Sequence, residues 1–369
     1  DVLISYGYGD GGGGVTRDML QSGRALEKVP GMPHVKYDTA GAFFDKLHEN
    51  VKQAEQNGEY VHTWDGELYL EYHRGTYTSQ AYNKKTNRHM ENKLVQTEWL
   101  SSLAYILGGG YAGQELNDSW ECVLLHQFHD IIPGSSIHEV YEDSRINYRT
   151  AEERADHVWE EALKTVIQEK EHTYSVYSTN SFGGKELVLI PEQEEGSFTD
   201  GSGRKLEAQK TERGYEVQVE TEPFAAIPVN FKPGEKKTAV SKTASSFDGA
   251  SVETPRYSIA WNEEGQLTRI YDKRVERSVL KEGQLGNVLE VYEDKPINFD
   301  AWDIDSNYIE QEVEGARDIT VEMVSQGLEA VLRVSGRISE SSYTQYIRLA
   351  ADSRRLVFDT EVDWKELHR

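Results

Sequence analysis

The stretch Ser136-Ile137-His138-Glu139-Val140-Tyr141 opens the clearest helical pattern in the chain. Ser136 and Glu139 have the spacing of a capping box, in which the two side chains satisfy free backbone amides of the first helical turn. The apolar residues that follow recur at intervals near 3.6 residues, which predicts a helix with one buried face. That face contains Ile137, Val140, Tyr141, Tyr148, Ala151, Ala155, Val158, Trp159, Ala162 and Val166.

Two further helical patterns lie upstream. One has Met90, Leu94, Leu100, Leu103 and Leu107 on one face and stops at Gly108-Gly109-Gly110. The other contains Phe43, Phe44, Leu47 and Val51. Because each pattern has a single apolar face, packing the helices against one another is the economical arrangement. We therefore predict a helical bundle domain over residues 33–170.

Downstream of Tyr174 the pattern changes to short β-branched and apolar runs separated by turn residues, as at 187–190, 215–219 and 330–334. Such spacing is typical of antiparallel β-sandwiches. Residues 257–270 predict a hairpin in which Gly265 takes the left-handed position. Residues 234–246 are rich in Lys, Ser, Thr and Ala and predict a linker. We expect a first β-sandwich over 171–245 and the start of a larger one over 246–369.

The first residues suggest strand, turn and helix, the repeating unit of an α/β layer. Val2-Leu3-Ile4 supply the strand, Gly9 to Gly14 the glycine-rich turn, and Thr16 to Leu20 the helix. So short a segment cannot bury a sheet by itself. We expect residues 1–32 to be the C-terminal edge of an α/β barrel that begins before Asp1, and the chain to be a fragment. The predicted fold class is multidomain α+β.

Composition excludes several classes of function. The 369 residues carry 40 Lys and Arg against 64 Asp and Glu, a net charge of -24, which disfavours nucleic acid and anionic membranes as partners. The chain has one cysteine, Cys122, no signal segment and no apolar run approaching the roughly 18 residues of a membrane span. We expect a soluble cytoplasmic protein. Homo-oligomerisation is left open.

Two candidate chemical groups lie at chain turns. Asp10 is the carboxylate of the glycine-rich turn, at a strand end where α/β folds place their sites, although such an Asp can also simply bond its own backbone. His129 and Asp130 follow an apolar helix and precede Pro133-Gly134. A neutral imidazole is a good zinc ligand and a carboxylate can bind a hydroxyl, but histidines also cap helix carbonyls.

Two further segments combine aromatic and polar side chains. Tyr72-His73-Arg74 lie in one, and Asp300 and Trp302 in the other. Aromatic faces to stack on and polar groups at the edges are what a polyhydroxylated ring requires. A packed loop in the first case and a solvated strand edge in the second are the plain structural alternatives.

In this order, the four segments resemble the retaining α-mannosidases of glycoside hydrolase family 38, particularly the bacterial and cytosolic branch. The residues that carry the resemblance are Tyr8 to Gly14, Tyr72 to Ser79, Phe128 to Ser135 and Asp300 to Asp303. The chain departs from animal members at Gly11 and His73, where those members carry aromatic residues. The resemblance implies a barrel, a three-helix bundle and C-terminal β-sandwiches, with one active site built across them.

The resemblance also implies roles. Asp10 corresponds to the general acid/base, His129 to a ligand of a divalent metal such as zinc or cobalt, and Asp130 to a residue that binds a sugar hydroxyl. Tyr72, His73, Arg74, Asp300 and Trp302 correspond to further substrate contacts, the substrate being a mannose-containing oligosaccharide. The nucleophile and the other metal ligands are expected upstream of Asp1. One histidine cannot hold a catalytic zinc, so we expect the isolated fragment to be inactive.

Two rival functions remain. The chain could act as a non-catalytic carbohydrate-binding or assembly module whose helical and β parts fold without the barrel. A metallophosphatase built on the glycine-rich turn is disfavoured by the net charge of -24 and by the lack of a basic phosphate clamp.

Overall fold

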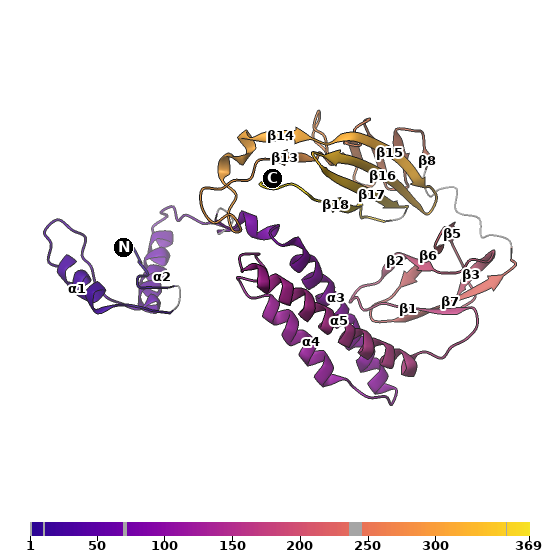
Figure 1. The fold of residues 1–369 in the computed structure, drawn as a ribbon, viewed down its shortest axis with the longest axis horizontal. Coiled ribbons are helices and arrows are strands. Elements are labelled where there is room, and N and C mark those ends of the chain that lie inside the picture. The colour runs from indigo at the N-terminus through magenta and orange to yellow at the C-terminus, as the bar shows by residue number, and fades with distance from the viewer. Residues whose placement is uncertain (1, 10–11, 69–71, 236–245, 352) are drawn as a thin grey trace. The chain divides into compact units, whose positions relative to one another are not determined.

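The structure is a computed structural model that describes residues 2–9, 12–68, 72–235, 246–351 and 353–369. The chain divides into two compact units, Asp1–Leu68 and Tyr69–Arg369. Figure 1 shows that the second unit combines a helical bundle with several antiparallel sheets. The predicted mixture of helices and antiparallel sheets is confirmed. The predicted linker falls mainly at 236–245, outside the described residues.

The first unit holds two helices, α1 (Arg17–Leu26) and α2 (Ala40–Gln56), neither of which has a buried residue. The hydroxyl oxygens of Thr16 and Thr39 accept hydrogen bonds from the first turns of α1 and α2, so each helix begins at a threonine cap. The strand predicted at 2–4 is wrong for the described residues. A strand needs a paired neighbour, and the pairing described near this segment is a single bridge between Tyr8 and Gly14.

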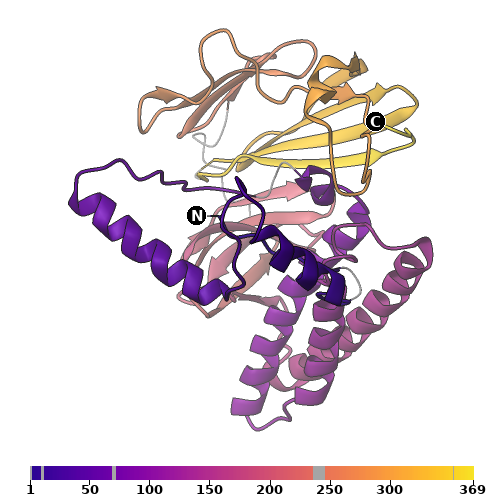
Figure 2. The same cartoon turned by 90° about the vertical axis from the view of Figure 1, so that its left-hand side faces the viewer.

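The bundle of the second unit consists of α3 (Ala81–Ile106), α4 (Gly113–His126) and α5 (His138–Val166), which pack side by side (Figures 1 and 2). A short 3-10 helix, η2 (Arg74–Tyr77), precedes α3. The α3 and α5 residues of the larger core cluster all come from the faces predicted by periodicity, whereas a second, smaller cluster also contains Ala104, which was not predicted. The larger cluster contains Met90, Leu94, Leu116, Val123, Tyr148, Ala151, Ala155 and Val158.

Two details of the helical prediction are wrong. The third helix of the bundle is α4, whereas the pattern at Phe43 to Val51 forms α2 in the first unit. The predicted capping box is absent, because α5 begins one residue later than a Ser136 cap requires and its N-cap is Ile137. The Ser136 hydroxyl instead donates to the carbonyl of Asp130 at 2.6 Å, and Ile137 is exposed.

The first β-sandwich packs a four-stranded sheet, in the order β1-β7-β3-β4, against a three-stranded sheet, β2-β6-β5. Alternate residues of both sheets point inward, as in Phe198, Phe231 and Val217, and form one core. The strands are β1 (Thr173–Tyr177), β2 (Gly184–Ile190), β3 (Gly196–Asp200), β4 (Lys205–Leu206), β5 (Ala208–Thr211), β6 (Gly214–Thr221) and β7 (Ala226–Pro233).

The second β-sandwich places the sheet β12-β11-β10-β9-β8 over the sheet β15-β16-β17-β18, with the pair β13-β14 beside them (Figure 1). The predicted hairpin is β10–β11, and Gly265 has the expected positive φ of 71°. The strands are β8 (Ser246–Phe247), β9 (Ser251–Glu253), β10 (Tyr257–Trp261), β11 (Leu267–Asp272), β12 (Arg277–Ser278), β13 (Glu290–Tyr292), β14 (Glu312–Gly315), β15 (Arg317–Ser325), β16 (Glu329–Ile338), β17 (Ser341–Ala350) and β18 (Val357–Asp363), and a 3-10 helix, η3 (Ser306–Glu310), precedes β14.

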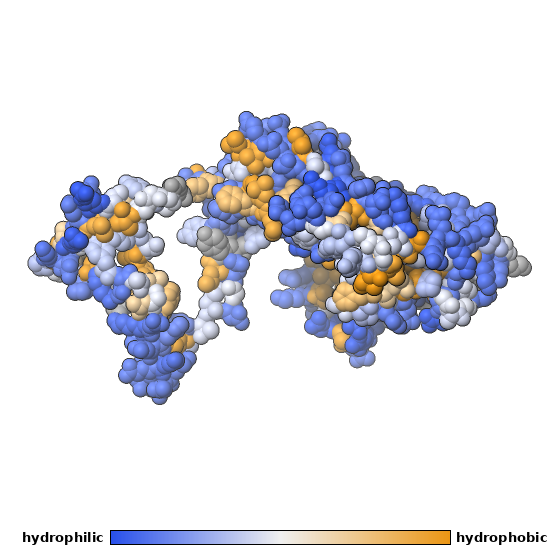
Figure 3. Space-filling model, turned by 90° about the horizontal axis from the view of Figure 1, so that it is seen from below, coloured by the Kyte–Doolittle hydropathy of each residue, from blue (hydrophilic) through white to orange (hydrophobic). Residues whose placement is uncertain are grey.

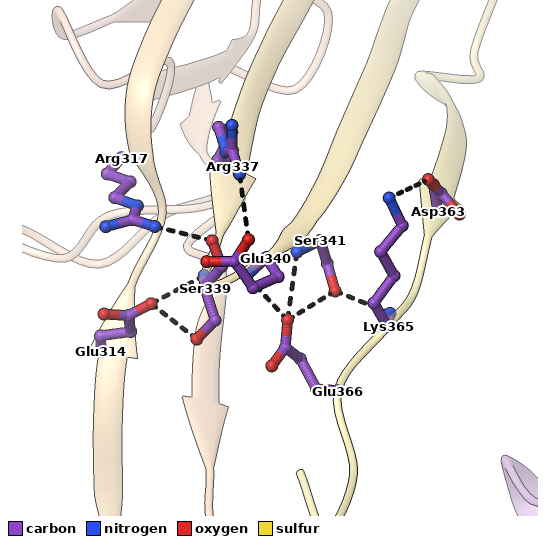
Figure 4. A network of polar contacts seen from close by, with 9 residues as sticks. All are labelled: Glu314, Arg317, Arg337, Ser339, Glu340, Ser341, Asp363, Lys365 and Glu366. Atoms are coloured by element: carbon purple, nitrogen blue, oxygen red, sulfur yellow. Dashed lines mark hydrogen bonds and ion pairs between the residues drawn. The ribbon is translucent and has the colours of Figure 1, made fainter.

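The turn between β16 and β17 is held by carboxylates from both sides (Figure 4). Glu314 accepts hydrogen bonds from the amide and hydroxyl of Ser339, both at 2.7 Å. Glu366, beyond β18, accepts from the amide and hydroxyl of Ser341 at 3.1 and 2.9 Å. Ser339 has a φ of 50°, an uncommon value for a residue with a side chain, and these bonds stabilise it there.

The two β-sandwiches are joined by a buried amide. Gln209 of β5 donates to the hydroxyl of Ser325 at 2.6 Å and accepts from the backbone amide of Leu328, also at 2.6 Å. Glu186 and Arg355 form an ion pair between the same sandwiches. Hydrophilic residues cover much of the visible surface of this unit, and apolar residues lie in separate patches (Figure 3). None of the helices in the described ranges is long and apolar enough to cross a membrane.

Candidate functional site

Three of the four sequence segments meet in the second unit. The segment that begins at η2 contacts the loop between β13 and η3, which carries Asp300 and Trp302. The amide of Gly75 donates to the carbonyl of Trp302 at 2.9 Å, and the hydroxyl of Ser79 lies 3.1 Å from the carbonyl of Ala301. Residues distant in sequence are thus joined through their backbones.

The same segment also contacts the turn after α4, which carries His129 and Asp130. Lys84 donates from its ammonium to the carbonyls of Ser79 and Ile132, at 2.5 and 2.6 Å. Gly134 lies directly against Ser79, and a Cβ at Gly134 would be only 2.6 Å from the Cβ of Ser79. Gly134 is buried and has a φ of 99°, so both space and backbone conformation require glycine here.

The backbone of Asp130 is fixed by groups from the start of α5. The hydroxyls of Ser136 and Tyr141 lie 2.6 and 3.4 Å from its carbonyl oxygen. The Ser136 amide in turn donates to the hydroxyl of Tyr141 at 2.9 Å. This carbonyl is therefore held, while the carboxylate of Asp130 remains about half exposed and available to a ligand.

His129 presents its ring to solvent. Its side chain is 73% exposed, its Nε2 lies 3.5 Å from Oδ2 of Asp130, and its ring packs 4.3 Å from that of Phe128. An exposed imidazole beside a carboxylate can bind a metal ion or donate a hydrogen bond.

The predicted substrate contacts are not all brought together by the structure. His73 and Trp302 meet edge to face, with ring centroids 5.0 Å apart, so the structure brings these two together. Arg74 is half-buried in η2. Tyr72 and Asp300 are exposed and are not part of the contact between the rings of His73 and Trp302.

The loop of Trp302 is strongly acidic. Burial raises the pKa of Asp294, and the negative charges of Asp300 and Asp305 raise it further, while His368 opposes them. The Oδ1 atom of Asp294 is buried without a hydrogen-bond partner among the described residues. A buried carboxylate oxygen without a hydrogen-bond partner costs free energy, and a cation or a hydroxyl donor near this loop would reduce that cost.

Asp10 lies outside the described residues, so its relation to His129 remains a prediction. Within the described ranges, no group of three or more His, Cys, Asp and Glu side chains is arranged to hold a metal ion. Since a catalytic zinc needs about three protein ligands, His129 and Asp130 do not form a metal site on their own.

A cavity of about 190 Å³ lies elsewhere, between the two β-sandwiches. Charged residues such as Glu186, Arg348 and Arg355 line it. None of the predicted site residues contributes to this cavity.

Sequence reasoning missed Lys84 as a member of the site. It placed Ser79 in a candidate segment and gave Gly134 only the role of turning the chain. Ser79 and Gly134 stand inside the quoted segments, but their contacts with each other depend on the tertiary fold. No sequence feature pointed to Lys84, because a lysine near the start of a helix is ordinarily a solvated surface residue.

Comparison with known proteins shows the family to which the chain belongs. The chain matches three family models in succession: "Glycosyl hydrolases family 38 N-terminal domain" at residues 1–67, "Alpha mannosidase middle domain" at 71–166 and "Glycosyl hydrolases family 38 C-terminal domain" at 252–369. The chain belongs to glycosyl hydrolase family 38, and the predicted family is confirmed.

The relatives agree with this assignment. Alpha-mannosidase G of Dictyostelium discoideum is 30% identical over 415 aligned positions, covering 100% of this chain and 37% of the relative. Alpha-mannosidase 2C1 of Homo sapiens is 27% identical, covering 99% of this chain and 34% of the relative. The chain thus spans about a third of the length of these curated relatives.

A solved structure shares the fold. A protein in glycosyl hydrolase family 38 from Enterococcus faecalis superposes with a TM-score of 0.65 at 16% identity, covering 94% of this chain and 49% of the other.

Proposed function

We propose that this chain is part of an enzyme that hydrolyses α-mannosidic bonds in oligosaccharides with retention of configuration, through a covalent glycosyl-enzyme intermediate. The observation that supports this best is the meeting of the η2 segment with the Trp302 loop and the His129 turn. The segments that meet carry an imidazole, carboxylates, a guanidinium and aromatic rings, the groups that recognise a sugar. The relatives named α-mannosidases supply the substrate class.

We further propose a role for each group. Asp10 is the general acid/base that protonates the departing oxygen, and Asp130 accepts a hydrogen bond from a sugar hydroxyl. His73 and Trp302 form an aromatic wall beside the sugar, supported by their edge-to-face contact. Tyr72, Arg74 and Asp300 are polar contacts further from the reacting bond.

His129 is proposed as one ligand of a divalent metal, zinc or cobalt, with the remaining donors outside the described residues. Such a metal would supply a positive charge that holds sugar hydroxyls. Because the described residues contain no complete ligand set, we propose that the chain by itself is inactive. Residues 1–32 as a barrel edge, the β-sandwich limits 171–245 and 246–369, and a cytoplasmic location remain part of this proposal. The bundle limit at residue 33 does not, because α2 belongs to the first unit.

The test is hydrolysis of a chromogenic α-mannoside by the 369-residue chain and by the complete protein that contains it, each with and without added zinc. Metal-dependent turnover by the complete protein alone is expected. Clear turnover by the chain alone would contradict its proposed inactivity. Saturable, metal-independent mannose binding without any turnover in either protein would favour the carbohydrate-binding module instead.

A further inference from the structure

Residues 75–84 contact two separate parts of the candidate site. At one end, the Gly75 amide and the Ser79 hydroxyl reach carbonyls of the Trp302 loop, at 2.9 and 3.1 Å. At the other end, the Lys84 ammonium reaches the carbonyl of Ile132, in the turn after His129 and Asp130, at 2.6 Å. The same ammonium donates to the Ser79 carbonyl at 2.5 Å, so one short segment bonds to both loops.

Lys84 has an unusual environment for a lysine. Its side chain is half-buried at the start of α3, and burial lowers the pKa of its ammonium. Hydrogen bonds from a charged donor are stronger than those from a neutral donor, and an ammonium removed from water costs free energy unless its protons are bonded. The two carbonyls that it contacts come from different segments, and the lysine therefore ties them together.

Close packing reinforces this connection. A Cβ on Gly134 would approach the Cβ, carbonyl carbon and carbonyl oxygen of Ser79 to between 2.6 and 2.9 Å. The turn that carries His129 and Asp130 therefore lies against the backbone of Ser79 without a side chain between them. A turn bonded and packed in this way has little freedom to move relative to α3.

We propose that Lys84 is a positioning residue that holds the His129–Asp130 turn in register with the Trp302 loop, with Ser79 as the intermediate connection. The proposal deepens the proposed function and rests on it for the identity of the ligand. Lys84 does not touch the substrate. It acts by fixing the distance between groups that bind different parts of the sugar, and small displacements of such groups reduce rates by up to about 100-fold.

The test uses the complete protein with Lys84→Met, which keeps the apolar stem and removes the donors. Lys85→Met is the matched control, because Lys85 is the next residue of α3 and is exposed. Hydrogen exchange is followed at the amides of Ile131, Ile132 and Gly134, which bond within the turn. We expect exchange at these amides to accelerate roughly tenfold or more in Lys84→Met and to stay unchanged in Lys85→Met.

Kinetics on an α-mannoside provide the second measurement. Loosened positioning should raise KM several-fold, whereas simple loss of folded protein lowers the apparent kcat at unchanged KM. Unchanged exchange in the turn, or faster exchange spread evenly over α3, α4 and α5 with an unchanged KM, would overturn the proposal. If Lys84→Met does not fold, Lys84→Gln is measured instead, because its shorter and neutral side chain also weakens the bonds to the Ser79 and Ile132 carbonyls, and the same acceleration is expected in the turn.

The proposed function and the positioning role of Lys84 can be refuted independently of each other. If the unmodified complete protein hydrolyses no α-mannoside, the proposed function is wrong, and hydrogen exchange alone then decides whether Lys84 positions the turn.

Discussion

The amide of Gly75 donates a 2.9 Å hydrogen bond to the carbonyl of Trp302 and thereby joins the start of the bundle to a loop of the second β-sandwich. Gly75 is buried, and a Cβ there would lie 3.0 Å from the carbonyl oxygen of Asp303 and 3.1 Å from the carbonyl carbon of Trp302. These atoms belong to the backbone and cannot rotate away. A single methyl group added at Gly75 would therefore strain the contact between the bundle and the second β-sandwich.

Gly75→Ala should lower the free energy of unfolding by about 1–3 kcal/mol, because overpacking at a rigid backbone contact forces a shift. Denaturant titration measures the change. Gly110→Ala is the control, since nothing lies within 4 Å of a Cβ at that position. Equal stability of the two variants would show that the Gly75 contact tolerates a side chain.

Asp10→Asn in the complete protein tests the acid/base role. Turnover of α-mannosides with poor leaving groups should fall much more than turnover of activated aryl mannosides, because only poor leaving groups need protonation. Steady-state kinetics on a series of leaving groups provides the comparison. Asp18→Asn, an exposed position in α1, is the control. Equal losses on all substrates would remove the acid role from Asp10.

His129→Ala should reduce the metal content of the complete protein together with its activity, since a lost ligand weakens the whole site. Metal analysis after dialysis measures the stoichiometry. His138→Ala is a suitable control, because His138 is likewise exposed in the bundle and pairs with Glu142 at 3.3 Å. Full metal content in His129→Ala would exclude His129 as a ligand.

Asp200 should make the stability of the first β-sandwich depend on pH. A hydrogen bond from the Ser202 hydroxyl, with further bonds from Arg204 and the Ser202 amide, lowers the pKa of Asp200 from 3.8 to about 2. A lowered pKa in the folded state contributes stability above the unfolded value of 3.8, and this contribution disappears as the pH falls towards about 2.

Denaturant titrations at several pH values between 5 and 2 test this expectation. The unmodified chain should lose stability over the lower part of this range, and Asp200→Asn should lose less, because the amide does not titrate. Asp18→Asn should behave like the unmodified chain. Parallel curves for Asp200→Asn and the unmodified chain would contradict the expectation.

Periodicity predicted the core residues of α3 and α5 in the larger cluster, because a helix repeats every 3.6 residues whatever its neighbours, but Leu107 and Ile137 of the predicted faces are exposed. It did not predict which helices pack together. The apolar residues at Phe43 and Phe44 form a helix as expected, yet α4 completes the bundle. A sequence pattern shows that a face requires a partner, and the identity of that partner depends on three-dimensional packing.

The capping rule failed at the start of α5. Ser136 has the capping spacing, but its hydroxyl donates to the Asp130 carbonyl and does not cap α5. A cap requires the serine oxygen to accept from an amide of the first helical turn. Because α5 begins one residue too late for Ser136 to be its N-cap, the Ser136 side chain bonds to the preceding turn.

The amino-acid sequence alone determined the family and the order of helical and β regions, because these follow from short patterns and residue types. Only the tertiary structure decided that His73 meets Trp302 and that Lys84 bonds to the turn beyond Asp130. The physical reason is that these contacts join residues far apart in the chain, and their distances depend on how separately folded elements pack.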